Sequence, residues 1–272
     1  MIYSKQFLWL LISVRKFNVG REILAKILEL FMKGKLVLFL LTIISGYAMA
    51  DVSTNDLKII CELTEKGRFE QALEKHLWFH EESKSAPSLA GVRLSYVISA
   101  WIDLGKKYPP AFEALREIRN HNRKILLSGK GNFDNFHDLS SINEGLNDEK
   151  DTLEVFLTLD SNYPSQAELY YVIAEELLIE HKKYNICEKY IGDPIIKYER
   201  LRHMRELNLS ITKTTPELNT PEFLDYADDS FVKGVVRLIE VLKAIDNIDM
   251  AIEIQERALS YFSHVSIKSA MQ

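Results

Sequence analysis

Residues 67–79 have the sequence GRFEQALEKHLWF and set the pattern for most of the chain. A turn-forming glycine comes first, and the residues after it that suit a core recur at intervals of three and four: Phe69, Ala72, Leu73, His76 and Phe79. This spacing places them on one face of an α-helix. The same spacing precedes the glycine, at Leu57, Ile60 and Leu63. The stretch therefore predicts two amphipathic helices joined by a glycine turn.

Helical spacing continues to the end of the chain. The alternating β-branched residues that indicate strands are nearly absent. Turn-forming residues separate the helical stretches, at Gly105, Gly129–Gly131, Pro164, Pro194 and 216–221. At 272 residues the chain is long enough to bury a substantial core. We therefore predict an all-α fold in which residues 51–272 form one helical domain.

The glycine turn and the small residue that follows it have counterparts later in the chain. Gly67 to Leu73 resemble the segment that joins helix A to helix B in tetratricopeptide repeats, where a small residue lets the helices approach closely. Equivalent small positions are Ala72, Ala111, Thr152, Cys187 and Ala251. Their separations are 39, 41, 35 and 64 residues, whereas a tetratricopeptide period is about 34. The units are thus degenerate, and the longest interval predicts an extra helix near 194–206 and a loop at 210–221.

The resemblance to tetratricopeptide proteins, of a bacterial exported type, implies an architecture and a role. It implies a right-handed α-solenoid of about five antiparallel helix pairs, with a concave groove lined mainly by the A helices. Such grooves usually receive a protein or a peptide, so the resemblance implies a non-catalytic partner-binding protein. By this analogy the candidate partner-binding residues are Lys58, Glu62, Arg93 and Tyr96 in the groove, and Trp78 toward one edge of its helix.

Residues 32–50 have the three parts of a cleavable secretory signal. Residues 32–35 (MKGK) are the positive region, 36–47 (LVLFLLTIISGY) the apolar region, and 48–50 (AMA) an A-x-A cleavage site. We therefore predict cleavage between Ala50 and Asp51 and a periplasmic or secreted protein. An uncleaved form would stay anchored in the membrane.

Residues 1–31 precede this signal, although export signals normally begin the chain. The favoured interpretation is an upstream extension from a misassigned start, with translation beginning at Met32. The alternative is a membrane-proximal extension, because residues 7–14 are apolar and basic residues follow them.

Charge limits the class of partner. Residues 1–50 hold seven of the 34 Lys and Arg residues and two of the 39 Asp and Glu residues, so the remainder has a formal net charge of −10. An acidic domain without a basic stripe argues against nucleic acid and anionic lipid as partners. We expect contact with a membrane only through the signal. The two cysteines, Cys61 and Cys187, either form a disulfide or remain buried thiols.

His76 and His80 give the sequence its one candidate metal pair. Residues four apart share a helix face and can ligate one transition metal. No third ligand is indicated, and His76 falls where the repeat places a large core residue, so packing is the favoured role. We find no catalytic motif and expect no cofactor. The alternative functions are a metal-dependent enzyme or factor that uses this pair, and an inhibitor or immunity-type protein.

Overall fold

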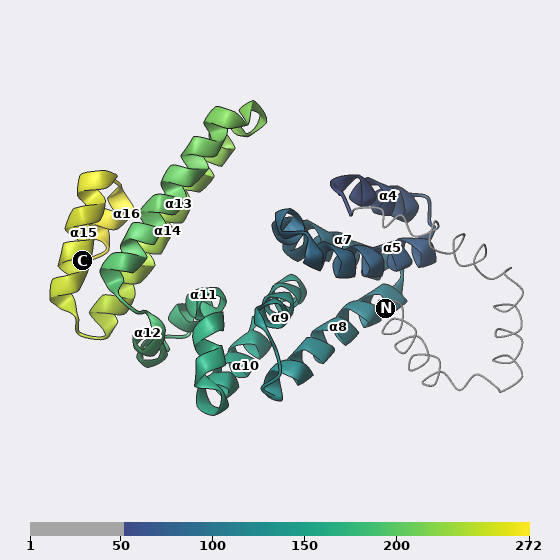
Figure 1. The fold of residues 1–272 in the computed structure, drawn as a ribbon, viewed down its shortest axis with the longest axis horizontal. Coiled ribbons are helices and arrows are strands. Elements are labelled where there is room, and N and C mark those ends of the chain that lie inside the picture. Colours follow the sequence, from purple (N-terminus) through teal and green to yellow (C-terminus); the bar gives the residue numbers. More distant parts are fainter. Residues whose placement is uncertain (1–51) are drawn as a thin grey trace, which may run out of the picture. The chain divides into compact units, whose positions relative to one another are not determined.

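A computed structural model describes residues 52–272, and this part of the chain is helical without strands (Figure 1), which confirms the all-α class. The secretory signal and the residues before it lie outside the described part. The longer helices are α4 (Thr54–Glu65), α5 (Phe69–Glu82), α7 (Ile98–Lys107), α8 (Pro109–Leu127), α9 (Phe133–Leu146), α10 (Glu149–Asn162), α11 (Pro164–Glu180), α12 (Tyr184–Tyr190), α13 (Pro194–Thr214), α14 (Pro221–Ala244) and α15 (Ile248–Tyr261). Shorter segments are η1 (Ser83–Ser85), η2 (Pro87–Leu89), α6 (Ala90–Val92), the π-helical η3 (Arg93–Val97), η4 (Pro216–Leu218) and α16 (Val265–Ser269).

Helix starts follow from the local sequence. Ser53 caps α4 in a reciprocal capping box with Asp56, and Asn132 caps α9 in the same way with Asn135. These caps satisfy backbone N–H groups that have no partner inside the helix. Proline stands in the first turn of α8, α11, α13 and α14, where its missing N–H costs nothing.

The turn between two paired helices repeats at the level of the backbone. A residue with positive φ stands five positions before four of the small residues named above: Gly67, Asn147, Lys182 and Asp246. In each turn, the N–H of the next residue donates to the carbonyl five residues earlier, as Arg68 does to Leu63 and Asp148 does to Asn143. This is the Schellman closure of a helix end. The second pair differs, because only Tyr108 separates the end of α7 at Lys107 from the start of α8 at Pro109.

The small residues after these turns are all buried: Ala72, Ala111, Thr152, Cys187 and Ala251. Thr152 takes the place of alanine without leaving a buried hydroxyl unpaired, because Asn143 Nδ2 donates to its Oγ1 over 3.0 Å. Helix–turn–helix pairs therefore recur through the described chain, as α4–α5, α7–α8, α9–α10, α11–α12 and α14–α15.

Successive pairs also contact one another, through α5 with α7, α7 with α9, and α9 with α11. The extra helix α13 runs beside α14 as a long hairpin (Figure 1). It extends to Thr214, so the sequence-based helix end at 206 was too early and the predicted loop is shorter. Gly234 allows the two helices to approach closely, because a Cβ there would lie 2.5 Å from Leu201.

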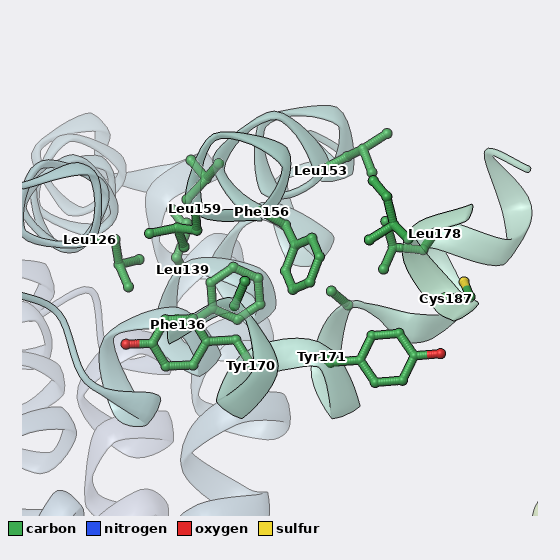
Figure 2. Packing of buried hydrophobic residues seen from close by; sticks show 14 of the residues in the cluster. Leu126, Phe136, Leu139, Leu153, Phe156, Leu159, Tyr170, Tyr171, Leu178 and Cys187 are labelled. Atoms are coloured by element: carbon green, nitrogen blue, oxygen red, sulfur yellow. The ribbon is translucent and has the colours of Figure 1, made fainter. Parts of the chain in front are cut away.

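The core of the described chain consists of four clusters of buried apolar residues spaced along the pairs. In its central part, side chains from α8 to α12 interdigitate, and the rings of Phe136 and Tyr170 stack with centroids 5.1 Å apart (Figure 2). Cys187 is buried in this cluster as a free thiol, and Cys61 is also free, so the two cysteines are not paired. Within residues 52–272, no helix is long and apolar enough to span a bilayer.

Candidate functional site

An open hollow of about 470 Å³ lies between α4 and η3 and is called the α4–η3 hollow below. Its lining comprises Thr54, Leu57, Lys58, Cys61, Glu62, Glu65 and Tyr96. Three of the predicted groove residues, Lys58, Glu62 and Tyr96, are thus brought together from two helices. The volume falls within the range of roughly 300–1,000 Å³ that is typical of ligand pockets.

The hollow offers both apolar and charged contacts. Tyr96 is 52% exposed, and its hydroxyl lies 3.2 Å from Cys61 Sγ; this hydrogen bond raises the pKa of the tyrosine. Glu62 pairs with Lys66 over 2.9 Å. Lys58 and Glu65 have no ion-pair partner among the described residues. Sequence reasoning did not single out Cys61, although its place one turn after Leu57 put it on the same helix face.

Arg93 was predicted to lie in the groove with Tyr96, and the structure corrects this placement. The Arg93 side chain is 2% exposed and points into the core, whereas Tyr96 faces solvent. In an α-helix, residues three apart share a face. The chain at Arg93–Val97 is a π-helix, whose i→i+5 hydrogen bonds turn the chain less per residue, so the two side chains diverge.

Arg93 instead belongs to a group of four buried side chains, His76, His80, Arg93 and Asp138, called the buried polar cluster below. Arg93 Nη1 forms an ion pair with Asp138 Oδ1, and His80 Nε2 lies 3.3 Å from Asp138 Oδ2. Burial opposes ionisation of Asp138, but its interactions with His80 and Arg93 outweigh burial and lower its pKa. The cluster joins α5, η3 and α9, which belong to the first three helix pairs.

His76 lies on the same face of α5, one turn before His80. Its ring stacks on Trp101 of α7 with centroids 5.1 Å apart. Trp101 Nε1 donates to the carbonyl of Ala111 over 2.9 Å, but neither ring nitrogen of His76 has a hydrogen-bond partner. Burial and, second, the positive charge that His80 can carry lower the pKa of His76 to about 3. His76 is therefore neutral near pH 7.

The two histidines do not gain a third metal ligand from the fold. Among residues 52–272, no group of three or more His, Cys, Asp and Glu side chains is arranged to hold a metal ion. The His76 ring packs on Trp101, and the nearest carboxylate to His80 is already paired with Arg93. The geometry therefore gives the metal-dependent alternative no support.

Trp78 lies apart from the α4–η3 hollow. It is partly buried against the apolar cluster that includes Leu57 and Phe79. The ammonium of Lys75 lies 4.4 Å from the centroid of its ring. The indole is thus largely committed to intramolecular packing, which makes Tyr96 the more accessible aromatic candidate for a partner.

A second hollow, of about 580 Å³, opens between α5 and α8 beside the buried polar cluster. His80 and Asn122 contribute to its lining, with Glu117 and His121 of α8. Asn122 Oδ1 accepts a hydrogen bond from Asn135 Nδ2 over 2.9 Å. Two titratable side chains of α8, Glu117 and His121, therefore share this hollow with His80.

No protein-family model, curated protein or solved structure matches this chain.

Proposed function

We propose that this protein is a non-catalytic helical-repeat module that binds a segment of a partner protein or peptide in the α4–η3 hollow. The observation that carries the proposal is the convergence of Lys58, Glu62 and Tyr96, from two consecutive helix pairs, on one open hollow. A half-exposed tyrosine at such a site is the kind of residue that anchors partners, because it buries a large area at a low cost in conformational entropy.

The composition of the hollow suggests the chemistry of the partner segment. Leu57 and the Tyr96 ring supply apolar area, while Lys58 and Glu65 supply charges of opposite sign. A peptide segment with one apolar side chain flanked by charges of both signs complements these groups. A polyanion does not, because Glu62 and Glu65 would repel it.

The finer architecture belongs to the same proposal. The repeated turns, the buried small residues and the contacts between successive pairs support a right-handed α-solenoid of the tetratricopeptide type. In that arrangement, α4 and the helical run α6–η3–α7 are the first two A helices, which line the concave side. We also propose that the module works outside the cytoplasm, a location supported by the secretory signal at 32–50.

Site-specific photo-cross-linking in native cells tests partner binding. Tyr96 is replaced by the photoreactive p-benzoylphenylalanine, and in a matched control Tyr226 of α14, which is 59% exposed, is replaced in the same way. We expect a discrete adduct from position 96 that disappears when Lys58→Glu is added. Equal adducts from both positions, or none from position 96, would contradict the proposal.

A further inference from the structure

The π-helical turn η3 contributes one residue to the buried polar cluster and another to the α4–η3 hollow. Arg93 extends from this turn into the cluster, while Tyr96 extends from it into the hollow. α5 supplies both histidines of the cluster and packs on α4, η3 and α7. Packing of α5 on α4 and on η3 therefore links the histidines of the cluster to the two elements that line the hollow.

His76, at the interface between the first two helix pairs, lacks hydrogen-bond partners among the described residues. Both ring nitrogens of His76 are buried without partners, and such groups cost free energy that is recovered when they reach water. A positive charge on His76 would be more costly, because no carboxylate contacts it. The Asp138 carboxylate lies beside His80 and is already paired with Arg93.

The described elements packed around His76 bring no carboxylate into contact with its ring. α4 contributes the apolar Leu57 and Ile60 to the adjoining core, and α7 contributes Trp101. η3 contributes the cationic Arg93. α9 contributes Asp138 and also His137, and α8 contributes Glu117 and His121, which line the same hollow as His80. None of the described contacts brings an anion to His76.

We propose that acidification releases the first helix pair, α4–α5, from the second by protonating His76 in an open state, and that this release dismantles the α4–η3 hollow. The biological meaning of the release, as acid-controlled loss of the partner, rests on the proposed function. The release itself does not.

Proton linkage gives the direction of the pH effect. The closed state is the one in which α4–α5 packs on the second helix pair, and the open state is the one in which it is released. The pKa of His76 is about 3 in the closed state and returns toward 6.5 once the ring reaches water. The closed state is therefore fully stable above pH 6.5 and loses stability as pH falls from 6.5 toward 3. For one proton, the ratio of open to closed molecules rises about 75-fold between pH 7 and pH 4.5. Asp138 stays ionised over this range, because its pKa lies below 3.8.

Hydrogen–deuterium exchange of the full chain, corrected for the intrinsic effect of pH, measures the release without any partner. In the wild type we expect the protection of α4 and α5 amides to fall by up to about 75-fold between pH 7 and pH 4.5, with little change in α14 and α15. His76→Phe keeps an aromatic ring against Trp101 without a titrating group, and it should abolish the fall. His137→Phe, which removes a neighbouring histidine on α9, should retain it.

Three results would overturn the proposal: protection of α4 and α5 in the wild type that does not depend on pH, an equal loss in α14 and α15, and an undiminished fall in His76→Phe. If the His76→Phe variant does not fold, the wild-type protection at pH 7 and pH 4.5 still tests the acid release. If position 96 gives no cross-link but hydrogen–deuterium exchange shows the loss of protection at low pH, the proposed function is rejected. The acid release is then still supported.

Discussion

At the scale of single residues, Arg93 shows how burial changes the role of a charged side chain. Its guanidinium and the Asp138 carboxylate are both nearly inaccessible to water and form an ion pair between η3 and α9. Desolvation makes such a pair a weak source of net stability, but removal of one partner leaves the other charge buried and uncompensated. The pair thus fixes the relative placement of the second and third helix pairs.

Arg93→Met tests this role. We expect a loss of about 3–5 kcal/mol in the free energy of unfolding, because Asp138 would keep only His80 as a partner. Arg116→Met is the matched control: Arg116 pairs with Glu113 over 2.9 Å at the surface, and its loss should cost at most about 1 kcal/mol. Urea unfolding measures both. Equal effects of the two variants would contradict the assigned role.

At the scale of elements, the turn between paired helices is the feature that recurs along the chain. Four of them use one left-handed residue, which is a glycine at position 67 and a different residue type at the other three. An L-residue in this conformation costs roughly 1–2 kcal/mol relative to a right-handed one. The recurrence of the turn despite this cost indicates that packing of the two helices determines the backbone.

Two glycine substitutions measure how backbone conformation alone affects the free energy of unfolding. A Cβ at Gly67 or at Gly91 would meet no atom within 4 Å, so neither substitution introduces a clash. Gly67 has a φ of +72°, and Gly67→Ala should destabilise the protein by about 1 kcal/mol. Gly91 lies in the helix α6, and Gly91→Ala should stabilise by about 0.4–1 kcal/mol. Thermal unfolding that gives both changes the same sign would refute this account.

At the scale of the whole molecule, local patterns were predictable and long-range pairings were not. The helical class and the small positions followed from spacing, because Ala72 or Ala251 needs only its own helix face and the turn before it. Asp138 was missed because its partner Arg93 is 45 residues away. A charge four residues before the buried Ile142 was the available signal. The π-helical turn left no mark in the spacing, so Arg93 was placed on the wrong face.

The export prediction also belongs to the whole molecule, because cleavage would change the charge of the entire chain. Loss of residues 1–50 takes the formal net charge from −5 to −10 and leaves Asp51 as the new N-terminus. We expect intact-mass measurement of the protein from a bacterial host to give a chain that begins at Asp51. Ala48→Leu combined with Ala50→Leu should leave the precursor uncleaved in the membrane fraction, because the cleavage site requires small residues. A purified protein that still begins at Met1 or Met32 would show that 32–50 is not a cleaved signal, and partner binding outside the cytoplasm would then lose its support.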